Sequence, residues 1–169
     1  MDATTARIYV GTYGKYNNGN LNGEWVDLDN FSTKDDFLEY CAEIHADEPD
    51  AEFMFQDYEG FPSSLYSESG IDDELFDYLA MDDDERELLE AYNNCFGEGY
   101  GDLRTAQDAS YGKHDSEQDF AENILDECGD LASIPENLRY YFDYEKYAND
   151  LFINDFTRDD ESGYVFSRA

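Results

Sequence analysis

Carboxylates dominate the residues of this sequence that could do chemistry, because 43 aspartates and glutamates stand against 10 lysines and arginines. On a helix that we predict over residues 33–46, Asp35, Glu39 and Glu43 recur every four residues, which places them on one stripe opposite the apolar face. The stripe has no basic neighbour. Like charges at this spacing destabilise a helix by about 0.2–0.5 kcal/mol per pair, so helix stability does not explain the pattern.

A second stripe, formed by Asp119, Glu122 and Asp126, follows on a helix that we expect to begin after Ser116. Only the acids at 82–85 have an ordinary structural explanation, because acidic residues in a first helical turn favour the positive end of the helix dipole. We predict a distributed acidic surface that binds a protein partner. Its residues are Asp35, Glu39, Glu43, Asp72, Asp73, Asp83, Glu87, Glu90, Asp119, Glu122 and Asp126.

The net charge of -33 exceeds what solubility requires. A solvated acidic face could explain any single stripe, but a small domain stays soluble with a net charge of about 2 to 8. So large a negative charge repels nucleic acid and anionic membranes, and it attracts proteins whose working surfaces are basic. We therefore expect neither a nucleic-acid partner nor a membrane partner.

The charge can be compared with that of DNA. Duplex DNA carries one charge per roughly 1.7 Å of axis, so the 33 net charges match about 56 Å of duplex. A compact chain of this length has a diameter of only about 40 Å. An elongated row of small domains would carry the charge at a DNA-like density, and this favours a DNA mimic.

Enzyme chemistry has little support. His45 and His114 lie in no spacing typical of a metal site or a catalytic triad, and Gly97–Gly101 lacks the basic and hydroxyl residues of a phosphate cradle. Paired carboxylates for glycoside hydrolysis are uninformative when acids are everywhere, and no stretch matches a calcium-binding loop. We predict that the chain is not an enzyme and has no cofactor or specific metal site.

Adaptation to high salt is an alternative explanation for the acids. It does not explain the 15 tyrosines and 12 phenylalanines, which are ample for a folded core. The three cysteines lie in apolar helical patterns, which indicates reduced thiols. No signal peptide is visible in residues 1–15, and no apolar run is long enough to span a membrane, so we expect a cytoplasmic protein.

The elements that position these residues predict an α+β fold in an elongated chain of three small domains. Residues 1–61 form an N-terminal α+β domain, 62–104 a central, mainly helical domain, and 105–169 a C-terminal α+β domain. These segments hold 14 acids and 3 bases, 13 and 2, and 16 and 5, so each has a net charge of -11. The predicted elements are strands at 7–13, 24–28, 52–58 and 164–166, helices at 33–46, 71–80 and 82–96, a helix capped by Ser116, and a helix start at 133–136 with Ser133 as its cap.

Residues 130–151, with the sequence DLASIPENLRYYFDYEKYANDL, closely resemble the antirestriction motif of ArdA-type antirestriction proteins. The segments 8–17, 23–26 and 55–59 are similar to other parts of that family, so the resemblance covers essentially the whole chain. Asn149 departs from the family, which commonly has arginine at this position of the motif.

The resemblance implies a curved, three-domain homodimer, encoded on a mobile genetic element, that imitates B-form DNA and blocks type I restriction-modification enzymes. It would engage their specificity and methyltransferase subunits. An acidic scaffold or chaperone for basic DNA-binding proteins is the alternative.

The resemblance also implies that the motif lies near the dimer contact. In agreement, residues 138–142 contain no acid, and they combine Arg139 with three aromatic rings, as interface cores do. The alternative is that these rings fill the core of the third domain. The residues predicted for the contact are Leu138, Tyr140, Tyr141, Phe142, Asp143, Tyr144 and Tyr147.

Overall fold

Alternating buried and exposed side chains form the first sheet. Ile8 and Val10 are completely buried on one face, whereas Arg7 is exposed on the other. The order is β2-β1-β3, both pairs are antiparallel, and a bulge between Tyr9 and Val10 shifts the register of β3. The strands are β1 (Arg7–Thr12), β2 (Glu24–Asp27) and β3 (Phe53–Glu59), which confirms the three strands predicted for this region.

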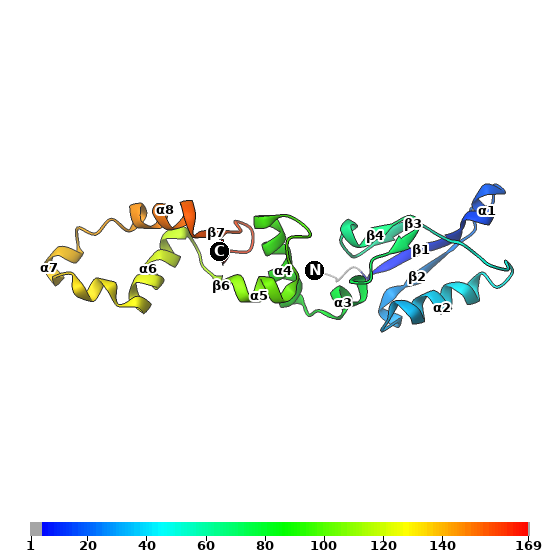
Figure 1. Cartoon of the computed structure of the whole chain (residues 1–169), viewed down its shortest axis with the longest axis horizontal. Coiled ribbons are helices and arrows are strands. Elements are labelled where there is room, and N and C mark those ends of the chain that lie inside the picture. The colour runs from blue at the N-terminus through cyan, green and yellow to red at the C-terminus, as the bar shows by residue number, and fades with distance from the viewer. Residues whose placement is uncertain (1–4, 169) are drawn as a thin grey trace. The chain divides into compact units, whose positions relative to one another are not determined.

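This sheet belongs to the first of two compact units in the computed structural model, which describes residues 5–168. The first unit ends at Met81 and the second begins at Asp82. Helix α2 (Lys34–Ile44) lies along one face of the sheet (Figure 1) and begins at Thr33, whose hydroxyl accepts a hydrogen bond from the Asp36 amide at 3.2 Å. This confirms the predicted helix.

The first core extends beyond the three strands. Phe37 and Cys41 of α2 are completely buried, and Phe61 and Leu75 pack into the same cluster. The helix predicted over 71–80 begins only at Leu75. Gly70 and Ile71 instead pair with the preceding strand as a short hairpin. The remaining elements of this unit are α1 (Tyr13–Asn17), β4 (Tyr66–Ser67), β5 (Gly70–Ile71), α3 (Leu75–Ala80) and 3-10 turns at Leu28–Asn30 and Ser63–Leu65.

The second unit opens with helix α4 (Asp83–Phe96), and a reciprocal cap fixes its start. The Asp82 carboxylate accepts from the Glu85 amide at 2.8 Å, and the Glu85 carboxylate accepts from the Asp82 amide at 3.0 Å. Gly97 follows the helix with a φ of 98°, a conformation that favours glycine. The helix predicted at 82–96 is therefore confirmed.

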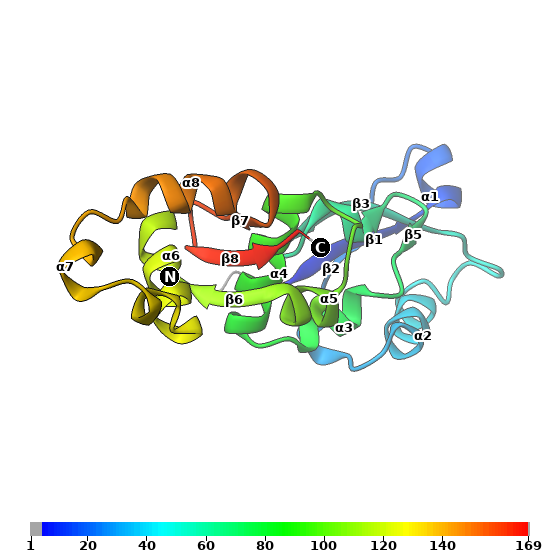
Figure 2. The ribbon, with the colours of Figure 1, turned by 60° about the vertical axis from the view of Figure 1, so that its left-hand side comes forward.

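The second sheet has the order β6-β8-β7, so β8 is its central strand (Figure 2). Adjacent residues of a strand face opposite sides. Val165 accordingly packs with Phe120 and Phe152 in one cluster, while Phe166 packs with Tyr92 of α4 in another. After α4, the second unit contains α5 (Leu103–Ala109), β6 (Ser110–Lys113), α6 (Glu117–Cys128), α8 (Tyr144–Asn154), β7 (Phe156–Arg158) and β8 (Tyr164–Ser167).

The segment between α6 and α8 differs from the prediction. A 3-10 turn at Asp130–Ser133 leads to α7 (Glu136–Arg139), which is only four residues long. The prediction that Ser133 caps a helix is wrong, because its hydroxyl donates to the Asp130 carbonyl at 2.7 Å and Pro135 immediately precedes α7.

Helices and small antiparallel sheets confirm the α+β class. The division into three domains and the elongated shape stay predictions.

Candidate protein-binding surfaces

The stripe on α2 is exposed to solvent. Asp35, Glu39 and Glu43 lie opposite the buried side chains Phe37 and Cys41. Within residues 5–168, these three carboxylates form no hydrogen bond or ion pair. Their charge therefore remains available to a partner.

The stripe on α6 is equally acidic but partly engaged. The Asp119 carboxylate lies 3.4 Å from Nδ1 of His114, and the Glu122 carboxylate accepts from the Gln118 amide at 2.9 Å. Asp126 is exposed at the other end of the helix. Because α6 carries no lysine or arginine, its exposed face stays negative.

Cations engage two other predicted surface acids. Lys34 pairs with Asp73, and Lys113 pairs with Glu87 at 2.7 Å. The hydrogen bond that the Lys113 ammonium donates to Glu87 raises the pKa of Lys113, which keeps this lysine charged. Asp73 and Glu87 are thus partly neutralised and offer less charge to a partner than the stripe on α2.

The other three predicted acids are exposed. The Asp72 carboxylate accepts from the Glu74 amide at 2.9 Å, while Asp83 and Glu90 lie on α4. The α2 stripe lies in the first unit, whereas the α6 stripe and the α4 acids lie in the second. That they form one continuous surface stays a prediction.

The predicted contact segment presents two rings to solvent. Tyr140 is 89% exposed and Tyr141 is 78% exposed, and their rings meet edge to face at 5.5 Å. Leu138 is exposed beside them, and the Arg139 guanidinium donates to the Ile134 carbonyl at 3.0 Å. These exposed rings do not fill a core.

The rings of Phe142, Tyr144 and Tyr147 are half-buried and pack together, whereas Asp143 is exposed. Phe142 lies 5.0 Å from the Tyr144 ring and 5.7 Å from the Tyr147 ring, and burial raises the pKa of Tyr147. Asp143 caps α8 by accepting from the Lys146 amide at 3.0 Å. The predicted contact set therefore divides into exposed rings and a supporting cluster.

Both histidines have structural partners. His45 is buried, with Nε2 3.2 Å from the Val10 carbonyl and Nδ1 3.0 Å from the Lys15 ammonium. Nε2 of His114 lies 3.0 Å from the Tyr111 carbonyl. Among residues 5–168, no group of three or more potential ligands could hold a metal ion.

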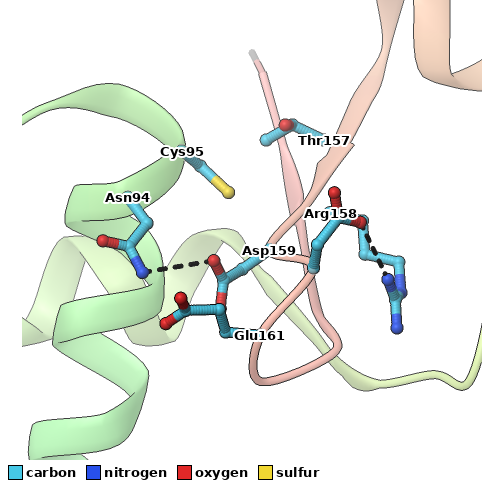
Figure 3. Close-up of a pocket in the computed structure, with 7 residues that line it drawn as sticks. Asn94, Cys95, Thr157, Arg158, Asp159 and Glu161 are labelled. Carbon is cyan, nitrogen blue, oxygen red and sulfur yellow. Dashed lines mark hydrogen bonds and ion pairs between the residues drawn. The ribbon is translucent and has the colours of Figure 1, made fainter.

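A polar pocket of about 410 Å³ lies between the end of α4 and the loop that follows β7 (Figure 3). Its buried Asp159 accepts from Asn94 at 3.2 Å and from the amide and hydroxyl of Ser162. Burial raises the pKa of Asp159, but the hydrogen bonds from Ser162 and Asn94 outweigh it and leave the pKa below its ordinary value. The pocket is lined by Asn94, Cys95, Thr157, Arg158, Asp159, Asp160 and Glu161.

This network closes the loop, and burial raises the pKa of the neighbouring Cys95 thiol. The sequence reasoning missed Asp159, although an aspartate followed by Ser162 and Gly163 is typical of a turn.

Sequence reasoning also missed the sheet face opposite α2, which we call the outer face. Trp25 is 37% exposed there, and the Arg7 guanidinium lies 4.8 Å from its ring centroid. The alternation of Arg7 and Tyr9 with the buried Ile8 was the signal that could have located this face. Its residues are Arg7, Tyr9, Trp25, Asp27, Asp57 and Glu59.

None of the helices that the structure describes is both long and apolar enough to cross a membrane. In a comparison with models of protein families, one model matches residues 8–166. Its family is described as antirestriction protein (ArdA). A search of curated proteins finds no match.

Proposed function

Because the chain belongs to the ArdA family of antirestriction proteins, we propose that it imitates DNA and occupies the basic DNA-binding groove of a type I restriction-modification enzyme. In this proposal the groove is formed by the specificity and methyltransferase subunits. The protein inhibits by occupying the groove, without chemistry and without a cofactor, and it acts in the cytoplasm, where the enzyme meets DNA.

The observation that carries the proposal is the net charge of -33 together with its exposure. Within residues 5–168 no cation pairs with the stripe on α2, and the α6 helix has no lysine or arginine. A basic groove that neutralises the phosphates of a duplex is complementary to such a surface. The 33 net charges correspond to about 56 Å of duplex.

A homodimer completes the proposal. Tyr140 and Tyr141 are exposed, and no acid lies between Leu138 and Phe142 to repel a second copy. Tyrosine and arginine are enriched at interface cores, and Arg139 supplies a positive charge in a strongly negative chain. Two subunits end to end would offer the charge of about 112 Å of duplex.

The test adds the purified protein to a type I restriction enzyme with an unmodified plasmid, and in parallel to its methyltransferase with a labelled duplex. We expect loss of cleavage and stoichiometric displacement of the duplex. A triple variant, Asp35→Asn, Glu39→Gln and Glu43→Gln, should inhibit more weakly. Full inhibition by that variant, or an enzyme that binds duplex and protein together, would contradict the proposal.

The alternative, an acidic scaffold for basic DNA-binding proteins, is tested in the same assay with an unrelated basic DNA-binding protein. A mimic of the type I substrate prefers the methyltransferase. A scaffold binds the unrelated protein at least as tightly.

A further inference from the structure

Two rows of side chains cross the outer face of the first sheet. In the first row Arg7 of β1 lies opposite Asp27 of β2 and Glu59 of β3. The Arg7 Nη2 atom is 2.7 Å from the Glu59 carboxylate. The side chains of Arg7 and Glu59 are 46% and 42% exposed, so this ion pair is accessible to a partner.

The second row is aromatic and acidic. Tyr9 lies between Trp25 and the exposed Asp57, and the Tyr9 and Trp25 rings meet edge to face at 5.5 Å. The Tyr9 hydroxyl donates to the Leu21 carbonyl at 3.1 Å and accepts from the Gly23 amide at 2.9 Å. These bonds hold the Tyr9 ring, which in turn supports the partly exposed Trp25.

The outer face already holds a guanidinium in this structure. The Arg7 guanidinium lies over the Trp25 ring and bonds to Glu59 at the same time. A planar guanidinium stacks on an aromatic ring and pairs with a carboxylate better than a compact, strongly hydrated ammonium does. The site is therefore matched to arginine, and Arg7 occupies it within the chain.

We propose that the outer face receives an arginine side chain of the target protein, which takes the position of Arg7 over Trp25. Asp27, Asp57 and Glu59 outnumber Arg7 on this face, so it attracts a basic surface. A second copy of the chain, with its own charge of -33, is repelled from it. The identity of the target rests on the proposed function, whereas the arginine site does not.

The first experiment titrates the full chain with hexa-arginine and with hexa-lysine, which carry equal charge. Trp25 is the only tryptophan, so its fluorescence reports on this site alone. We expect hexa-arginine to change the Trp25 emission and hexa-lysine to change it much less. Calorimetry should show a preference for hexa-arginine that Trp25→Leu lowers by about two- to fivefold.

Matched variants test whether the preference for hexa-arginine depends on Trp25. Tyr100→Leu removes another exposed ring and should leave the preference unchanged, whereas Trp25→Phe should retain part of it. Arg7→Gln vacates the position over the ring and should tighten hexa-arginine binding. An unchanged preference in a folded Trp25→Leu variant, or an unchanged Trp25 emission, would overturn the proposal.

The second experiment measures inhibition of the type I enzyme by the same variants. Inhibition should weaken about two- to fivefold in Trp25→Leu, as expected for the loss of one cation-π contact. If wild type inhibits and Trp25→Leu inhibits equally, the outer face is not in the target contact and this inference is wrong. If wild type does not inhibit at all, the proposed function fails, while the peptide titration still decides the arginine site.

Sedimentation of Trp25→Leu is the last test. A loss of self-association in this variant would make the outer face a contact between copies and overturn the inference.

Discussion

Aromatic rings are buried in one region of the molecule and exposed in another. Phe37 of α2 is completely buried, with its ring centroid 6.0 Å from Phe55 and 6.2 Å from Phe76. Tyr140 and Tyr141, which follow the one-turn helix α7, are almost fully exposed. A helix of three turns can lay one face on a sheet, whereas a single turn cannot cover its own rings. The first region stabilises the fold, and the second leaves aromatic surface exposed to solvent.

The largest contrast should appear in thiol reactivity. Burial raises the pKa of Cys41 to about 12, and Cys41 lies one turn from Phe37, whereas Cys128 is exposed at the end of α6. Because the thiolate is the reacting form, Cys41 should react only when the core opens, at least about a thousandfold more slowly than Cys128. Timed alkylation followed by mass spectrometry measures both rates. Similar rates would show that the first core is not closed.

Truncation of the two rings should separate their contributions to stability. Phe37→Ala should lower the free energy of unfolding by about 3–5 kcal/mol, because it leaves a cavity in the core. Tyr141→Ala should change it by less than about 0.5 kcal/mol, as expected for an exposed side chain. Urea denaturation followed by circular dichroism measures both. A large loss of unfolding free energy in Tyr141→Ala would show that this ring packs in the core.

A charge placed on the exposed rings should act on assembly and leave folding intact. Tyr141→Asp should weaken the homodimer by about 2 kcal/mol or more, or roughly thirtyfold, because interface tyrosines carry much of the binding energy. Tyr100→Asp, at another exposed ring, is the control and should leave self-association unchanged. Sedimentation at several concentrations measures this. A wild-type chain that stays monomeric at tens of micromolar would refute the dimer.

The acids of α2 should contribute nothing favourable to stability. Neutralising Asp35, Glu39 and Glu43 together should leave the fold unchanged or stabilise it by about 0.2–0.5 kcal/mol per like-charge pair removed. Inhibition should fall gradually, because the attraction is summed over many screened charges. Dose-response curves for the single and triple variants measure this. Complete loss in Glu39→Gln alone would indicate a specific carboxylate site.

Local signals predicted α2, α4 and α6, but α8, which is as long as α2, was not predicted. The Thr33 hydroxyl and the spacing of Phe37 and Cys41 located α2, and the Ser116 hydroxyl, which accepts from the Asp119 amide at 3.0 Å, located the start of α6. These signals lie within one or two turns of each other. They can therefore be recognised without knowing the rest of the fold.

The short strands β6 and β7 were not predicted. β6 and β7 have four and three residues, and each is a strand only because it pairs with β8. The helix cap predicted at Ser133 is wrong because the Ser133 hydroxyl donates to the Asp130 carbonyl instead.

Local spacing likewise predicts only those candidate surfaces that lie on one element. The acids of α2 were predicted as an exposed stripe from helical spacing alone. The outer face depends on the pairing of Trp25 with Tyr9 across two strands, which periodicity within one segment does not specify.

The salt dependence of binding tests the central claim most directly. The affinity of the protein for a type I methyltransferase is measured between about 50 and 200 mM salt, beside that of a duplex containing the target site. A DNA mimic releases the same ions from the groove as DNA does, so both affinities should fall steeply and with similar slopes. An affinity for the protein that does not change with salt, while that of the duplex falls, would contradict DNA mimicry.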